Sequence, residues 1–147
     1  MSKSKILTYL TGNMSSFYEQ GRYAEATEWR KVAQEILKQC NIKVFDPTKN
    51  SNEHYNHPTH YSDGIILQNY TYLKKSDVLL VNLDLFEESL GSVWEVSIAW
   101  ERHIPVIAFG RCDKWISRPH FKNLFTVDCR DVEEACEYIG SMYAEMI

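Results

Sequence analysis

Short, almost uninterrupted apolar runs alternate along the chain with longer stretches in which apolar residues recur every three or four positions. The second pattern is typical of amphipathic helices. The first is typical of strands that are buried on both faces of a sheet, as in the run Val78-Leu79-Leu80-Val81. Together the patterns predict strands at residues 5–11, 42–45, 77–83, 104–109 and 125–129, and helices at residues 22–39, 64–75, 93–102 and 131–146.

This order of elements predicts an α/β fold with a five-stranded parallel sheet and helices on both faces. Ligands of such sheets bind beyond the carboxyl ends of the strands, where the strand order reverses. That rule directs attention to three loops, at residues 12–16, 46–60 and 84–92. A chain of 147 residues is the usual size of one domain, so residues 1–147 are predicted to form a single one.

Composition and charge exclude several classes of partner. Sixteen basic against 20 acidic residues give a net charge of −4, without the clustered positive face that a nucleic-acid binder needs. No apolar run approaches the ~20 residues of a membrane-spanning helix, and the first residues lack the apolar region of a signal peptide. Four widely spaced cysteines without a Cys-x-x-Cys motif indicate reduced thiols. We therefore expect a cytoplasmic protein with neither a nucleic acid nor a membrane as partner.

The segment at residues 82–95 follows a predicted buried strand and enters a helix. Gly91 allows close backbone approach there, and the first amides of the helix are free to bind an anion. Ser89 and Ser92 add hydroxyl groups. The segment therefore predicts a site for a phosphate or a carboxylate.

Glu95 in the same segment has two readings. Ser92-x-x-Glu95 matches a capping box, in which Glu95 bonds back to the amide of Ser92. Alternatively, Glu95 is an ionised carboxylate in the first helical turn beside a cleft, a state that suits a nucleophile.

Five motifs occur in order along residues 5–110: Tyr9-Leu-Thr-Gly12, Phe45-Asp-Pro47, Ser76-Asp-Val-Leu-Leu-Val-Asn-Leu-Asp84, Ser89-Leu-Gly-Ser-Val-Trp-Glu95-Val-Ser-Ile-Ala99 and Ile104-Pro-Val-Ile107. In this order the chain resembles the nucleoside 2-deoxyribosyltransferase family. The resemblance implies a flavodoxin- or Rossmann-like sheet and cleavage of the N-glycosidic bond of a nucleoside or nucleotide. It also implies that Glu95 attacks the anomeric carbon, in line with the general logic of retaining glycosidases.

Ser89 separates two branches of the family. Transferases that act on nucleosides commonly carry an aspartate six residues before the glutamate, whereas nucleotide hydrolases carry a serine, a neutral donor suited to a 5′-phosphate. The resemblance therefore favours a (deoxy)nucleoside 5′-monophosphate, bound by Ser89 and Gly91, with Tyr9 closing the pocket and with Gly12 and Asn13 near the phosphate and sugar. It implies no cofactor and no metal, and a homodimer or higher homo-oligomer.

One position departs from the family. Where an aspartate is usual near the leaving base, this chain has Asn69, which can orient base or sugar but cannot transfer a proton. Asp63 and Asp84 are the alternative acids, and Asp84 is also a candidate substrate-binding residue. Two other functions stay open: transfer of deoxyribose between bases, and a nucleotide-binding module without turnover.

Other side chains are weaker candidates. Ser117, in the region that follows the fourth predicted strand, is a candidate phosphate contact, with Arg111, Lys114 and Arg118 near it. His54, His57 and His60 are better explained as loop residues than as metal ligands, although one of them, or Tyr55 or Tyr61, can line the base pocket. The four tryptophans, Trp29, Trp94, Trp100 and Trp115, are expected in the core or in a subunit interface.

Overall fold

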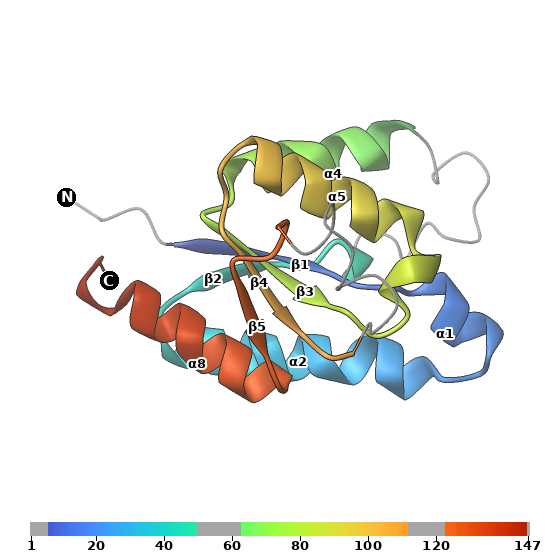
Figure 1. Cartoon of the computed structure of the whole chain (residues 1–147), viewed down its shortest axis with the longest axis horizontal. Coiled ribbons are helices and arrows are strands. Elements are labelled where there is room, and N and C mark those ends of the chain that lie inside the picture. The colour runs from blue at the N-terminus through green and yellow to red at the C-terminus, as the bar shows by residue number, and fades with distance from the viewer. Residues whose placement is uncertain (1–5, 50–62, 112–122, 147) are drawn as a thin grey trace.

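Five parallel strands form the centre of the molecule in this computed structural model, which describes residues 6–49, 63–111 and 123–146 (Figure 1). The strands are β1 (Leu7–Thr11), β2 (Lys43–Phe45), β3 (Val78–Asn82), β4 (Val106–Phe109) and β5 (Val127–Cys129). They lie side by side in the order β2-β1-β3-β4-β5. The predicted α/β fold with a parallel sheet is confirmed, and the strand order reverses between β1 and β3.

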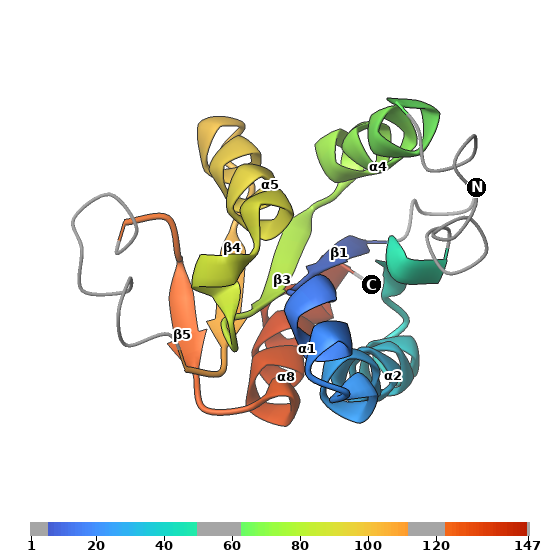
Figure 2. The ribbon, with the colours of Figure 1, turned by 90° about the vertical axis from the view of Figure 1, so that its right-hand side faces the viewer.

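Helices cover both faces of the sheet (Figure 2). One face carries α2 (Tyr23–Gln39) and α8 (Val132–Met142), and the other carries α4 (Asp63–Lys75) and α5 (Leu90–Glu101). The short helix α1 (Ser15–Glu19) follows β1, and two 3₁₀ turns, η1 (Phe86–Glu88) and η2 (Ala144–Met146), complete the described elements.

Side chains that alternate along the strands fill two hydrophobic layers. Leu10 and Leu80 face the α2 and α8 side, whereas Tyr9 and Leu79 face the α4 and α5 side. Successive residues of a strand point to opposite faces, and helices cover both faces of this sheet. Each of these four side chains is therefore fully buried. Every residue of β3 is buried, as its apolar run predicts.

The element boundaries differ from prediction in several places, and β4 and β5 each begin two residues later than expected. Helix α1 lies in a segment that was expected to be a loop, and α5 begins at Leu90 instead of residue 93. The last helix ends at Met142, where a 3₁₀ turn follows. The predicted left-handed stop after α2 is confirmed, since Asn41 has a φ of 59°.

Two expectations from composition concern the described residues. Cys40, Cys129 and Cys136 are free thiols, and Cys112 lies outside the described segments. Burial raises the pKa of Cys136 to about 12, so this thiol stays protonated. Among the helices that the structure describes, none has the length and apolar character needed to cross a bilayer.

Candidate active site

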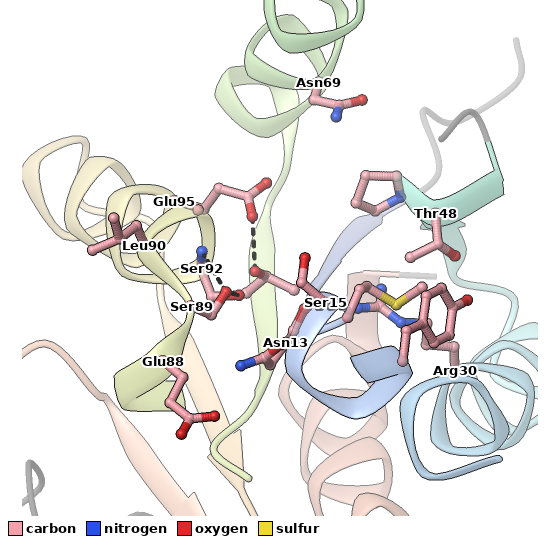
Figure 3. Close-up of a pocket in the computed structure, with 16 residues that line it drawn as sticks. Asn13, Ser15, Arg30, Thr48, Asn69, Glu88, Ser89, Leu90, Ser92 and Glu95 are labelled. Carbon is pink, nitrogen blue, oxygen red and sulfur yellow. Dashed lines mark hydrogen bonds between the residues drawn. The ribbon is translucent and has the colours of Figure 1, made fainter. Parts of the chain in front are cut away.

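A pocket of about 380 Å³ opens at the carboxyl ends of the strands, where the order of the sheet reverses (Figure 3). All three loops that the sequence singled out contribute to it. The described lining residues are Thr11, Gly12, Asn13, Met14, Ser15, Tyr18, Arg30, Pro47, Thr48, Asn69, Glu88, Ser89, Leu90, Gly91, Ser92 and Glu95.

Glu95 projects from the second turn of α5 into this pocket and is held by β1. The Tyr9 hydroxyl donates to its Oε2, and the Thr11 hydroxyl donates to its Oε1 at 2.8 Å. Tyr9 and Thr11 are two residues apart on one strand, so their side chains leave the same face and meet the same carboxylate. The two bonds fix the carboxylate's orientation and leave it at the pocket wall.

The environment of Glu95 changes its acidity in two directions. Burial raises its pKa above the ordinary value, whereas the hydrogen bonds from Tyr9 and Thr11 and the positive charge of Arg30 lower it. The balance is a raised pKa. Burial and the charge of Glu95 also raise the pKa of Tyr9, so the phenol stays protonated and donates.

This raised pKa predicts a pH-dependent effect of Glu95→Gln on stability. A carboxyl group whose pKa is higher in the folded than in the unfolded chain stabilises the fold most below its unfolded pKa, and this stabilisation is lost as pH rises through the folded pKa. Glutamine does not titrate. We therefore expect Glu95→Gln to melt at a higher temperature than the wild type at about pH 7.5, with the difference shrinking toward about pH 4.

Calorimetric melting curves at both pH values measure this difference. The control is Glu101→Gln, the same substitution at an exposed position at the end of α5. A difference that grows on acidification contradicts the prediction.

The start of α5 supplies a set of hydrogen-bond donors beside Glu95. Ser89 is the N-cap residue: its Oγ accepts from the Ser92 amide at 3.2 Å and donates to Ser92 Oγ at 2.9 Å. The amides of Leu90 and Gly91 lie in the first turn, where the helix supplies no acceptor. An anion in the pocket at this end of the helix meets these donors and the positive end of the helix dipole.

The predicted capping box at Ser92 and Glu95 is wrong. Because Ser89, and not Ser92, caps the helix, Glu95 is six residues from the cap and its carboxylate bonds to β1 instead. Ser89, Gly91 and Glu95 all line the pocket, as the sequence predicted.

Gly12 lines the pocket at a point where the backbone passes close to other side chains. A Cβ atom there would lie 2.9 Å from a Trp29 ring carbon and 3.2 Å from Asn82 Cβ. The Gly12 carbonyl also accepts from Arg30 Nη2 at 3.1 Å. The absence of a side chain at Gly12 therefore allows the backbone to pack closely against Trp29 and Asn82.

We expect Gly12→Ala to lower the free energy of unfolding by about 1–3 kcal/mol, because the added methyl group overfills a rigid contact. Urea denaturation at neutral pH measures the loss. Gly91→Ala is the matched control for stability, since a Cβ atom at Gly91 meets nothing within 4 Å. Equal losses in the two variants would contradict this explanation.

Asn69 reaches the pocket from α4, whereas Glu95 reaches it from α5 (Figure 3). Its Oδ1 atom is buried and has no hydrogen-bond partner among the described residues. A buried unpaired acceptor is unfavourable unless a ligand or water satisfies it. Asn69 is thus placed to accept a hydrogen bond from a bound molecule.

Three other predicted site residues have different surroundings from those expected. Tyr9 does not line the pocket but holds Glu95 from behind it. Asn13 lines the pocket, yet its amide is engaged within the protein, donating to Leu85 O at 2.7 Å and accepting from the Ser16 amide at 3.0 Å. Asp84 lies in a separate cavity, where its Oδ1 accepts from the Arg111 amide at 2.9 Å.

Asp84 therefore does not line this pocket, because its side chain turns toward the carboxyl end of β4. The structure does not describe several other candidates. They are the side chain of Asp63 and the whole of Tyr55, Tyr61, His54, His57, His60, Lys114, Trp115, Ser117 and Arg118. Within residues 6–49, 63–111 and 123–146, no three metal-ligating side chains lie close enough together to hold an ion.

Thr11 and Arg30 are two of the pocket residues that the sequence analysis did not name as candidates. Thr11 lies two residues after Tyr9 on β1, so both side chains point to the same face of the strand. This spacing would have indicated that Thr11 lies beside Tyr9 at the site. Arg30 lies four residues after Ala26 and seven before Leu37, on the buried face of α2. A charged residue on an apolar helical face is the signal that would have found it.

The tryptophans divide between core and surface. Trp29 is buried and packs edge-on against Phe109, with ring centroids 5.3 Å apart. Trp94 and Trp100 are 45% and 55% exposed on α5. Neither is therefore a core residue, and their place in a subunit interface stays a prediction.

A family model described as nucleoside 2-deoxyribosyltransferase matches residues 9–124 of this chain. The match covers every element that lines the pocket, from β1 through α5. The chain belongs to the nucleoside 2-deoxyribosyltransferase family. A search of the curated proteins gives no match.

Solved structures of similar fold accompany this family match. A conserved protein from Enterococcus faecalis V583 is 18% identical, with a TM-score of 0.72 over 95% of this chain and 99% of its own. A 2-deoxyribosyltransferase from Bacillus psychrosaccharolyticus is 16% identical, with a TM-score of 0.62 over 90% and 91%. The CMP N-glycosidase BcmB of Clostridium botulinum is 12% identical, with a TM-score of 0.57 over 93% and 98%.

Membership of the nucleoside 2-deoxyribosyltransferase family makes this protein an enzyme of the glycosyl-transfer or glycosyl-hydrolysis type. Its substrates are small nucleosides or nucleotides. The solved neighbours, all below 25% identity, support the fold and not the choice among these substrates.

Proposed function

We propose that this member of the family hydrolyses the N-glycosidic bond of a (deoxy)nucleoside 5′-monophosphate, with Glu95 as the nucleophile, and releases the free base. One observation carries the proposal: a carboxylate oriented by two hydroxyls shares a pocket with the free donors at the start of a helix. A nucleotide has a reacting carbon and an anionic group at opposite ends of one sugar, which matches these two features.

In the proposed first step, a Glu95 oxygen bonds to the anomeric carbon as the bond from that carbon to the base nitrogen breaks. The electron pair of the broken bond goes to the base, which takes up a proton. Water then attacks the same carbon, releases the Glu95 carboxylate and yields the sugar phosphate and a proton. The hydroxyls of Tyr9 and Thr11 keep the carboxylate oriented through both steps.

The start of α5 favours the phosphate end of such a substrate. The Ser92 hydroxyl and the first-turn amides are neutral donors, so they bind an anion without a basic surface. The proposal thus agrees with a chain whose net charge is −4.

Asn69 is assigned the orientation of base or sugar. Its buried, unpaired Oδ1 is an acceptor suited to a sugar hydroxyl or an exocyclic amine. An amide does not transfer protons, so the base in this proposal is not protonated by Asn69.

Incubation with a panel of ribo- and deoxynucleoside 5′-monophosphates, followed by chromatography for free base, tests the proposal. We expect base release from at least one nucleotide and less from the matching nucleoside. No release from any nucleotide, under conditions in which a related enzyme works, contradicts the proposal. Formation of a new nucleoside or nucleotide after addition of a second base identifies transfer instead.

We also propose that the enzyme is cytoplasmic and forms a homodimer or higher homo-oligomer. Exposed apolar side chains on α4 and α5 support self-association. They are Ile66, Leu67, Leu90, Trp94 and Trp100. Leu90 also lines the pocket. Sedimentation equilibrium is expected to give at least twice the mass of one chain. A monomer at all concentrations contradicts this part of the proposal.

A further inference from the structure

Arg30 is a buried cation at the wall of the pocket that the proposed reaction does not use. Its side chain is 3% exposed and makes three hydrogen bonds, each to a different segment. Nε donates to Ala26 O at 3.2 Å within α2, Nη1 to Asp46 Oδ1 at 3.0 Å, and Nη2 to Gly12 O at 3.1 Å. One guanidinium group thus ties α2 to the loops that follow β1 and β2.

These bonds leave Arg30 facing the pocket on the side opposite Glu95 (Figure 3). The guanidinium has five N–H donors, and its three bonds within the protein do not use all of them. Its charge lowers the pKa of Glu95. Burial lowers the pKa of Arg30 itself, and the charges of Asp46 and Glu95 oppose that effect. The two charges therefore interact across the pocket.

Asp46 opposes this interaction from behind Arg30. Its Oδ1 accepts from Arg30 and from the amide and hydroxyl of Thr48, and its Oδ2 accepts from Gln34. The carboxylate is buried with the guanidinium, so it neutralises much of the positive charge that Glu95 meets. Among the residues that the structure describes, the other ionisable groups at this site are the Tyr9 phenol on β1, the Tyr18 phenol on α1 and the Glu88 carboxylate on η1.

We propose that Arg30 is a positioning residue that keeps Glu95 ionised and ready to act as a nucleophile, and that Asp46 sets how strongly Arg30 does so. The catalytic part rests on the proposed function, whereas the electrostatic coupling does not. A solely structural tie between loops predicts no effect on the ionisation of Glu95.

The coupling is testable in the absence of any turnover. Protein labelled with ¹³C at the glutamate carboxyl is titrated by NMR, and the Glu95 signal is assigned by its loss in Glu95→Gln. Asp46→Asn keeps an acceptor for Arg30 but removes the opposing charge, so the pKa of Glu95 is expected to fall by about one pH unit. Arg30→Met combined with Asp46→Asn removes both charges without stranding one, and the pKa of Glu95 is expected to rise by a similar amount.

Two further variants complete the design. Arg30→Lys keeps the charge and is expected to leave the pKa of Glu95 closer to the wild type than the double variant does. Arg130→Met with Glu134→Gln removes an exposed ion pair elsewhere and is expected to have no effect. Opposite shifts in the two Asp46 variants support the proposal. Shifts in the same direction, or shifts no larger than in the Arg130 control, overturn it.

The activity arm separates this inference from the proposed function. If the enzyme releases base, the acid limb of kcat/KM is expected to move in the same direction as the NMR titration for each variant. Opposite NMR shifts without any base release keep the coupling and refute the hydrolysis. Base release with an acid limb that does not move refutes the role of Arg30 and keeps the hydrolysis. If the double variant fails to fold, a fall in the Glu95 pKa in Asp46→Asn that exceeds the shift in the Arg130 control supports the proposal, and the absence of such a fall overturns it.

Discussion

Glu95→Gln is expected to lower the rate of base release from a nucleotide by about a thousandfold or more, because the amide cannot form the glycosyl ester on which the proposed reaction depends. The variant is expected to fold, since glutamine still offers an acceptor to the Tyr9 or Thr11 hydroxyl. Single-turnover measurement of free base by chromatography gives the loss.

Glu101→Gln again serves as the control, because it removes a carboxylate from the same helix at an exposed position outside the pocket. Its rate is expected to match the wild type. Undiminished base release by Glu95→Gln would assign the nucleophile to another group. Binding of intact nucleotide by the inactive variant, seen by calorimetry, would show that the loss lies in the chemistry.

Ser89→Asp is expected to lower kcat/KM for a nucleoside 5′-monophosphate by about 100-fold, since two charges ~6 Å apart at an effective dielectric of ~20 repel by ~3 kcal/mol. Aspartate caps a helix as well as serine does, so α5 keeps its start. The matching nucleoside lacks the phosphate and is expected to lose much less. The measured quantity is the ratio of the two kcat/KM values.

Ser89→Asn is the matched control for charge, because asparagine has nearly the shape of aspartate and also caps helices. We expect it to keep most of the preference for the nucleotide. Equal losses for nucleotide and nucleoside in Ser89→Asp would place the phosphate elsewhere in the pocket.

The sheet was predictable because its central strand carries an unbroken apolar run. A strand such as β3 needs helices on both faces to cover it, and helices alternate with strands along the chain. The carboxyl-end rule then located the three loops, and with them Ser89 and Gly91, whereas the role expected for Glu95 came from the resemblance to the family.

The partners of these residues were less predictable, because they depend on contacts between distant segments. Both Ser89 and Ser92 are good N-cap residues, and a difference of three residues in the helix start decides whether Glu95 turns back to the cap or reaches β1. Asp84 follows the end of β3, as a ligand-binding carboxylate would. Its carboxylate instead accepts a hydrogen bond from the Arg111 amide, in the loop that follows β4.

The bond between Tyr9 and Glu95 spans 86 positions of the chain, and it joins the first strand to the helix that follows the third. Forming a contact of this kind costs chain entropy, because a long loop must close. A partly folded chain in which β1 has not met α5 exposes Glu95 to water as an ordinary glutamate. The oriented and buried state of the Glu95 carboxylate therefore exists only where β1 and α5 are in contact.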